Sequence, residues 1–426
     1  MGNRQRIALG SFVLLFAFFA LALPAFAVAS RPNALDRMVD AIPAGDLLVK
    51  PAVVLVDGAR FAAAQRLQAI RTPLWVLTLV LQILVLAYFW QSGAAARVRD
   101  WLRVRLRNEF AVRFCIGALL VVIAKLAAFI PQYIEYRALR AMTLVNVLSL
   151  GWLHAWFVGT VIASAIAGLL VAGVLSLADR THQWYLYTIA GIFGLTIALA
   201  YLNPFVIAPA FARYSPLPPG AARVVDSVES SAGIRVPALE EHISDRTKTA
   251  AAFVSGLGNG ERIVLSDTVL QSSPPPELRF VTAHVLEHVR DNVPMRDAIA
   301  QALTVICSIG LAILIADRIG FRRDDDAVSR IALLGALLVA TSAVVLPFYY
   351  AFERRVDRAA DAFAVAQSRD PAAGVRYFVR RADQDLLTVC PKRWQVWFIG
   401  EHEPVGPRIS AVQGRADDCA STLPRR

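Results

Sequence analysis

The sequence predicts a mainly α-helical, polytopic membrane protein with about seven transmembrane helices and a small polar α/β region. First, its 426 residues are 57% hydrophobic and 18% charged, against about 45–50% apolar and about 25% charged residues in soluble domains. Second, apolar runs of membrane-spanning length recur, separated by short loops rich in arginine. Third, two polar stretches, 205–297 and 352–426, carry strand-like and helical patterns.

The apolar runs predict the individual spans, because a transmembrane helix needs about 20 mostly apolar residues. The seven candidates are 7–30, 73–90, 111–131, a stretch within 153–177, 184–202, 298–316 and 328–350. The first ends in Ala25-Phe26-Ala27, which fits either a cleaved signal peptide or an uncleaved anchor. The chain thus divides into 1–30, the spans and loops of 31–204, the polar stretch 205–297, a helix pair in 298–351, and the polar stretch 352–426.

The net charge of +11 indicates membrane topology rather than nucleic-acid binding, because the arginines lie in short loops between apolar runs. With seven spans, the arginine groups share one side of the membrane: Arg4 and Arg6, then Arg97, Arg99, Arg103, Arg105 and Arg107, then Arg322 and Arg323. Lys and Arg in short loops favour the cytoplasmic side. We therefore expect both polar stretches to lie outside the cytoplasm.

The first polar stretch predicts a β-hairpin followed by a helix. Residues 250–256 read as an extended edge segment, Gly258-Asn259-Gly260 as a turn, and 262–265 as a second strand. The Ser- and Pro-rich run 272–277 then marks a loop and a helix start.

That helix carries the residues that point to chemistry. His284 and His288 are four positions apart, so they share one helix face and can reach one metal ion. This spacing is typical of H-E-x-x-H zinc sites, which need a third protein ligand and an open position for water. About seventy residues on, Asp357 and Asp361 repeat the four-residue spacing. Either pair, taken alone, also fits an ordinary polar helix surface.

Several blocks in the second half of the chain carry a resemblance to a known family. In order, they are Phe205 to Phe211, Tyr214 to Leu217, Phe253 to Gly258, Arg262 to Thr268, Ala283 to His288, Arg354 to Ala364, and His402-Glu403-Pro404 with Arg408-Ile409. Each block is weak alone. Together and in this order, they resemble the type I CAAX prenyl proteases, integral-membrane zinc metallopeptidases related to the HtpX-like proteases.

The resemblance implies a fold and an activity. It implies transmembrane helices around a large chamber, with a gluzincin-like metallopeptidase region at its mouth. It implies one zinc ion held by His284, His288 and Asp357, with Asp361 behind the ligands. It further implies hydrolysis of peptides or membrane-associated proteins, with membrane lipid and peptide as partners.

The chain departs from the family pattern at the chemical positions. The family's general base directly follows the first histidine, where this chain has Val285. The third ligand is a glutamate in the family and Asp357 here, which is one methylene shorter. An edge-strand asparagine that holds substrate aligns with Ala251. A valine cannot accept the proton that a metal-bound water must lose.

Other residues have two interpretations each. Glu287 is either a replacement base, in the order H-x-x-E-H, or a carboxylate paired with Arg290 or Arg354. His402 is either a donor to a transition-state oxygen or an exposed loop histidine. Arg408 is expected to pair with Asp361 or another buried acid. Cys390 and Cys419 form either a disulfide, if their region faces an oxidising compartment, or two thiols.

The sequence therefore leaves two functions open. The first is a membrane zinc metalloendopeptidase that is weak or has lost catalysis, and the second is a pseudoprotease that holds peptide or lipid without cleaving it.

Overall fold

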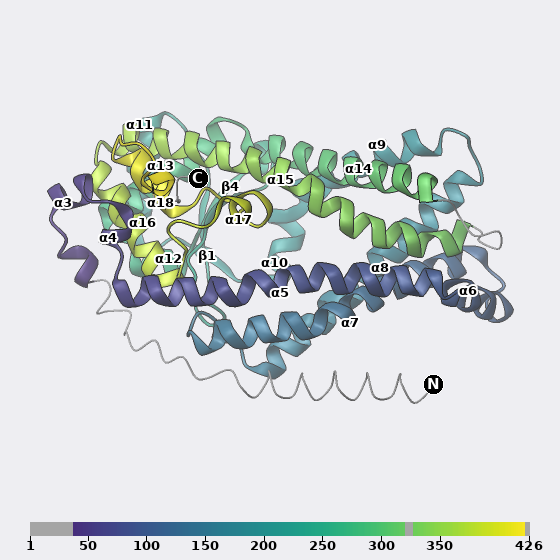
Figure 1. The fold of residues 1–426 in the computed structure, drawn as a ribbon. Helices are drawn as coiled ribbons and strands as arrows, with labels where there is room; N and C mark the ends of the chain where they lie inside the picture. The colour runs from purple at the N-terminus through teal and green to yellow at the C-terminus, as the bar shows by residue number, and fades with distance from the viewer. Residues whose placement is uncertain (1–36, 320–326, 422–426) are drawn as a thin grey trace.

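Six long apolar helices dominate the structure, a computed structural model that describes residues 37–319 and 327–421 (Figure 1). They are α5 (Gly58–Gln91), α7 (Glu109–Ala141), α8 (Ser149–Ala178), α9 (Trp184–Leu202), α14 (Val293–Ile319) and α15 (Ala327–Ser368). Each is long and apolar enough to cross a membrane. They confirm six of the seven predicted spans. The first candidate, 7–30, lies outside the described residues.

Several of these helices are longer than the predicted spans; α7, for example, continues ten residues past Pro131, the predicted end of its span. Helix α5 begins at Gly58, and Pro73, which the sequence suggested as the start of a span, lies inside it. Helix α15 runs without a break across the expected boundary at residue 351, so the last span and the Asp357 segment are one helix. Polarity marks where a helix leaves the membrane, but it does not end the helix, because the backbone hydrogen bonds continue in either solvent.

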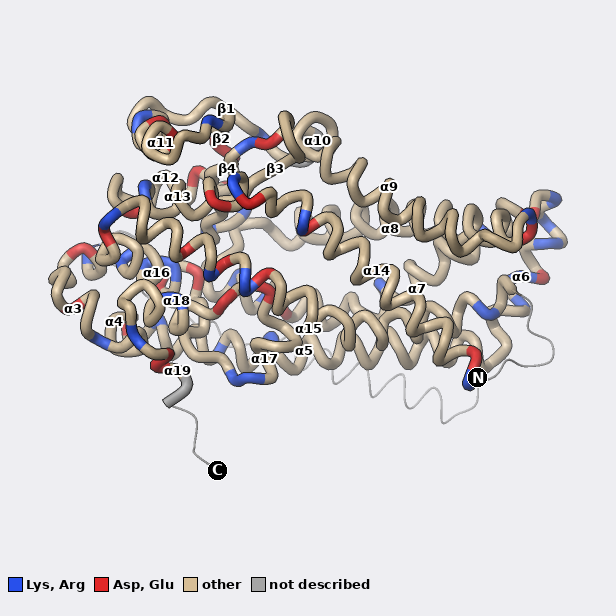
Figure 2. The backbone as a smooth tube through the Cα atoms, turned by 90° about the horizontal axis from the view of Figure 1, so that it is seen from above, with Lys and Arg blue, Asp and Glu red and all other residues tan. Residues whose placement is uncertain are grey.

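Charged residues gather at the two ends of the helices and are few in between (Figure 2). One end carries the arginine-rich helix α6 (Ala94–Arg105), with the end of α14 and the start of α15. The opposite end carries a small sheet and the shorter helices. This distribution is the one expected of a protein whose middle is surrounded by hydrocarbon.

The sheet contains four strands: β1 (Tyr214–Pro216), β2 (Ala238–Glu241), β3 (Ala252–Ser255) and β4 (Arg262–Ser266). Their order is β1-β2-β4-β3, with β2 parallel to β4 and β3 antiparallel to it. The β3–β4 pair is the predicted hairpin. Gly256 closes it with φ +98°, and a Cβ there would lie 2.4 Å from the Gly260 carbonyl oxygen, so only glycine fits. Strand β3 forms an edge of the sheet.

Shorter helices cover the sheet and complete the polar end. They are α3 (Ala44–Val49), α4 (Ala52–Leu55), η1 (Asn203–Ile207), α10 (Ala208–Phe211), α11 (Pro219–Ala232), η2 (Gly258–Gly260), α12 (Asp267–Ser272), α13 (Pro275–Arg290), α16 (Pro371–Asp385), α17 (Arg393–Phe398), α18 (Val405–Val412) and α19 (Asp418–Ser421). One apolar core joins α3, α4, α11, α12, α13, α16 and α18 to the sheet, and its residues Ile263, Phe280, Leu286 and Val379 are fully buried. The two polar stretches of the sequence therefore fold as one unit.

A buried ion pair fixes α13 against α16. Arg380 and Glu277 are each 1% exposed. Arg380 donates from Nε and Nη2 to the two Glu277 oxygens, both at 2.9 Å. Its Nη2 also donates to Asp40 at 2.6 Å. The N-terminal turn of the histidine-bearing helix is thus anchored to the helix that follows α15.

Replacing Glu277 with Gln should destabilise the protein, because it removes the buried carboxylate that accepts hydrogen bonds from two nitrogens of the Arg380 guanidinium. Breaking one partner of a buried pair typically costs about 3–5 kcal/mol. We expect a clear drop in the thermal unfolding midpoint of the purified protein in detergent. Asp46→Asn is the control, since it breaks the exposed Lys50–Asp46 pair, and such surface pairs contribute about 0–1 kcal/mol. Equal midpoints for the two variants would contradict this assignment.

Candidate metal site

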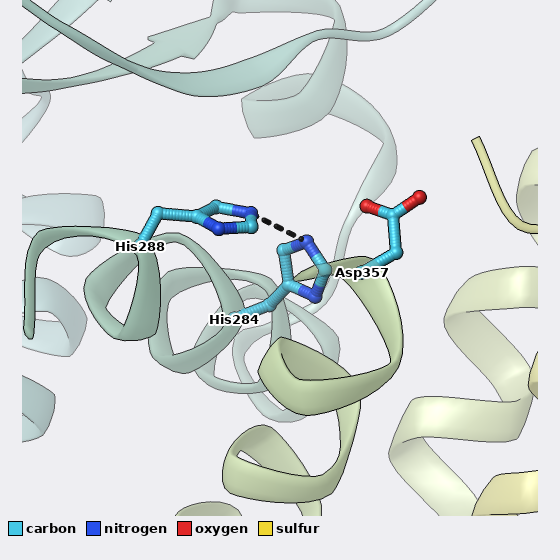
Figure 3. Close-up of side chains that lie close together, drawn as sticks. All are labelled: His284, His288 and Asp357. Carbon is cyan, nitrogen blue, oxygen red and sulfur yellow. Dashed lines mark hydrogen bonds between the residues drawn. The ribbon is translucent and has the colours of Figure 1, made fainter. Parts of the chain in front are cut away.

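Helix α13 presents His284 and His288 side by side on the face toward α15 (Figure 3). It starts at the predicted loop, with Pro275 and Pro276 in its first turn, where proline lacks only a hydrogen bond that the helix does not make. The Nε2 atoms of the two histidines are 3.2 Å apart. Two nitrogens bound tetrahedrally at about 2.0–2.1 Å from zinc would be separated by roughly 3.3 Å. The pair therefore has the spacing of two ligands of one ion.

His284 is held in the tautomer that leaves Nε2 free. Its Nδ1 lies 2.8 Å from Asp361 Oδ1, and a carboxylate can only accept, so Nδ1 carries the hydrogen. Arg408 donates to both oxygens of Asp361 at 2.7 Å. A carboxylate behind a histidine ligand is the usual arrangement in zinc sites, where it fixes the ring and raises its basicity.

His288 is held less completely. Burial, followed by the positive charge that His284 can carry, lowers the pKa of His288 to about 3. The ring is therefore neutral at physiological pH, as a metal ligand must be. Its Nδ1 has no hydrogen-bond partner among the described residues. The orienting contact present at His284 is thus missing at His288.

Asp357 on α15 completes a group of three residues that could hold an ion. One ligand atom from each of His284, His288 and Asp357 lies within 4.8 Å of the others. Asp357 Oδ2 accepts from the backbone N–H of Glu403 at 3.0 Å and lies 3.2 Å from His402 Nδ1. The hydrogen bond with Asp357 raises the pKa of His402. The expected ligand set is thus assembled, and His402 contacts its carboxylate.

Val285 and Glu287, which lie between the two histidines in the sequence, depart from the H-E-x-x-H pattern of zinc peptidases. Val285 is fully buried in the apolar core. Glu287 forms an ion pair with Arg290 at 2.7 Å, and the Arg290 guanidinium lies over the ring of Phe363. Neither Val285 nor Glu287 lines the chamber that the two histidines face. Glu287 therefore points along the flank of α13, with its charge already paired.

The histidines open onto a chamber of about 1560 Å³ between the long helices and the polar end. Its wall includes strand β3 and residues of α5, α9, α14 and α15. Two acidic residues, Asp297 and Glu353, also line it, and Tyr349 donates a hydrogen bond to Asp297 at 2.7 Å. Neither acidic residue was predicted from the sequence as part of a site. The available signal was ionisable residues at the ends of apolar spans, which mark cavities in membrane proteins.

A disulfide between Cys390 and Cys419 closes the segment that carries His402 and Arg408. Of the two alternatives left open, the structure contains the bridge. Gly406 packs against it, because a Cβ there would lie 2.4 Å from the Cys419 sulfur. The bridge stabilises the turn that brings Glu403 and His402 to Asp357.

Comparisons with known proteins give this geometry a family context. Residues 221–416 match the model of peptidase family M48. An uncharacterized metalloprotease, YhfN of Bacillus subtilis (strain 168), is 24% identical over 338 residues, covering 76% of this chain and 78% of that protein. A CAAX prenyl protease 1 homolog of Oryza sativa subsp. japonica is 23% identical over 266 residues, or 60% of this chain and 62% of that protein.

The fold also matches a solved structure. The crystal structure of S. mikatae Ste24p superposes with a TM-score of 0.71 at 17% identity, covering 94% of this chain and 98% of that chain. The membrane helices, the small sheet and the histidine helix therefore form a Ste24p-like fold. Residues 221–416 thus resemble peptidase family M48 in sequence, and the chain as a whole resembles Ste24p in fold.

Proposed function

We propose that this protein is an integral-membrane zinc metalloendopeptidase-like protein of the CAAX prenyl protease type. In this proposal His284, His288 and Asp357 bind one zinc ion, and hydrolysis is slow or lost. The observation that carries the proposal is the three-residue group on the chamber wall, combined with valine where the family has its base. M48 peptidases are zinc-dependent, and the donor set of two imidazoles and a carboxylate suits zinc.

Each residue has a defined task in this proposal. Zinc, when bound, polarises a peptide carbonyl and acidifies its water. Asp361 and Arg408 keep His284 in the correct tautomer. His402 holds the Asp357 carboxylate and stands where it could donate to a developing oxyanion. The chamber has room for a peptide segment, while the proton acceptor is missing.

The second candidate, a pseudoprotease that holds peptide or lipid without cleaving it, is favoured by the combined departures. Val285 cannot take a proton, Glu287 is paired with Arg290, and Ala251 offers no side-chain hydrogen bond to substrate. A general base typically contributes roughly 10²–10⁴-fold to a rate. Loss of that factor alone would separate this chain from an efficient peptidase.

Zinc binding to the folded state should stabilise the protein. A ligand that binds only the folded form adds about 2.7 kcal/mol at a concentration of 100 times its Kd. Chelator-treated protein should therefore show a higher unfolding midpoint after zinc is added, and dialysed protein should retain close to one ion per chain. An unchanged midpoint and background zinc content would contradict the proposed metal site.

We further propose that the polar end with the metal site lies outside the cytoplasm. The arginines of α6 are at the opposite end of the helices, where the topology rule favours the cytoplasm. The Cys390–Cys419 disulfide at the metal-site end is consistent with an oxidising compartment.

Cysteine labelling tests this orientation. The two free thiols, Cys115 and Cys307, are first replaced by serine. In that background, Asp245→Cys at the metal-site end should react with a membrane-impermeant maleimide on intact cells or spheroplasts. Arg180→Cys, in the turn at the opposite end, should react only after permeabilisation. The reverse pattern would invert the topology.

A further inference from the structure

Arg381 on α16 is a buried guanidinium with an unused donor. The residue is 6% exposed and lines the chamber. Its Nη2 donates to the Ala250 carbonyl at 3.3 Å and contacts Asp385, which is also buried. Its Nη1 is buried and has no hydrogen-bond partner among the described residues.

An unused donor of this kind is energetically unfavourable. A buried polar group without a partner typically costs about 1–3 kcal/mol, and more when it is charged. The group that best satisfies a guanidinium N–H is a carboxylate, which forms shorter and stronger charge-assisted hydrogen bonds. All three chamber-lining arginines have a carboxylate partner, Glu135 for Arg71, Asp361 for Arg408 and Asp385 for Arg381. Among the described residues, Arg381 alone of the three keeps a buried nitrogen, Nη1, without a hydrogen bond. Arg381 therefore offers the chamber an anion-binding donor.

Arg381 lies beside the strand edge to which a peptide could add. It contacts the carbonyl of Ala250, just before β3. Within residues 37–319 and 327–421, strand β3 pairs only with β4. Residues 250–256 line the chamber. A peptide that added to the free edge of β3 in the antiparallel sense would run from Gly256 toward Ala250. Its C-terminal end would then approach Arg381.

We propose that Arg381 forms a carboxylate-binding subsite in the chamber, which takes the C-terminal carboxylate or an acidic side chain of the bound peptide. This inference rests on the proposed function, because it needs a chamber that accepts peptide. Asp385 keeps the guanidinium oriented. Its own Oδ1 is buried and has no hydrogen-bond partner in the described part of the chain, so it can accept a peptide N–H beside the bound carboxylate. Arg381 would thus select peptides that carry a negative charge at their C-terminal end.

The subsite is tested by binding, with zinc removed so that a carboxylate cannot bind the metal. Full-length, chelator-treated protein in detergent is titrated with two fluorescent unstructured peptides of identical sequence, one ending in a free acid and one in an amide. The free acid should bind roughly tenfold more tightly or better, the effect of one charge-assisted hydrogen bond. Arg381→Gln should remove this preference while leaving the affinity for the amide peptide nearly unchanged.

Three further variants test whether the preference for the free-acid peptide depends on Arg381 itself. Arg71→Gln, which removes another chamber arginine, should keep the preference. Arg381→Lys should retain part of it, since the charge remains but the planar donor is lost. Arg381→Gln combined with Asp385→Asn replaces the ion pair by two neutral amides and should behave like Arg381→Gln alone.

A third peptide identifies the source of the carboxylate. It carries an amide terminus and a glutamate near its C-terminal end. Tight, Arg381-dependent binding of this peptide shows that an acidic side chain suffices, and weak binding shows that the terminus is required. Equal affinities of acid and amide peptides for the wild-type protein, or an unchanged preference in Arg381→Gln, would overturn the subsite. The zinc content, measured separately, reports on the proposed function itself.

Discussion

Replacing Val285 with Glu is expected to raise the rate of peptide hydrolysis by the zinc-loaded protein. The change restores a carboxylate at the sequence position directly after His284, where the family has its general base. It should recover part of the roughly 10²–10⁴-fold that a general base supplies. Recovery should be incomplete, because Asp357 remains short and Ala251 remains without a side-chain donor. Product formation from an unstructured fluorogenic peptide, measured at equal zinc content, reports the gain.

Two variants serve as controls for this gain. Val285→Gln introduces a side chain of the same size that cannot act as a base, so it should show the packing cost without faster turnover. Because Val285 is fully buried, both variants should unfold at a lower temperature than the wild-type protein. A rate increase shared by Val285→Gln would show that general-base catalysis is not the cause.

Removing either histidine ligand is expected to abolish zinc retention. His284→Ala or His288→Ala leaves two protein ligands, and zinc sites of this type use at least three. Zinc in the dialysed variants, measured by elemental analysis, should fall to background. Unchanged zinc in His288→Ala would remove this residue from the site.

Two more conservative variants test the same site through its zinc affinity. Asp361→Asn keeps the size of the side chain that orients His284 but not its charge, and loss of such a partner typically costs about 10–100-fold in metal affinity. Asp357→Glu should strengthen zinc binding, because the longer side chain closes the gap to the histidines. A weaker affinity in Asp357→Glu would place Asp357 outside the coordination sphere.

Much of the fold could be predicted from sequence because its signals are local. Apolar length alone located six spans, and the turn residues at 258–260 located the β3–β4 hairpin. The four-residue spacings placed each pair, His284 with His288 and Asp357 with Asp361, on a shared helix face. These signals depend on helix and strand periodicity, which neighbouring residues determine.

Long-range packing could not be predicted in the same way. Nothing in the sequence near Glu287 shows whether it faces the chamber or Arg290, since this depends on how α13 packs against α15. Likewise, Arg381 reads as one of several charges on an amphipathic helix until its contact with Ala250 is seen. The start of α5 at Gly58 was not predicted, because its first turns contain polar residues and do not read as a membrane span. These turns contact α16 rather than lipid.

The central claim is that the chain keeps a zinc site in a membrane chamber without a working base. The most direct test is the turnover of an unstructured peptide by wild-type protein that carries one zinc per chain, compared with Glu287→Gln. We predict that the wild-type protein keeps its zinc and cleaves very slowly or not at all, and that Glu287→Gln leaves any residual rate nearly unchanged. Rapid cleavage by the wild-type protein that Glu287→Gln abolishes would contradict the claim and identify Glu287 as the base.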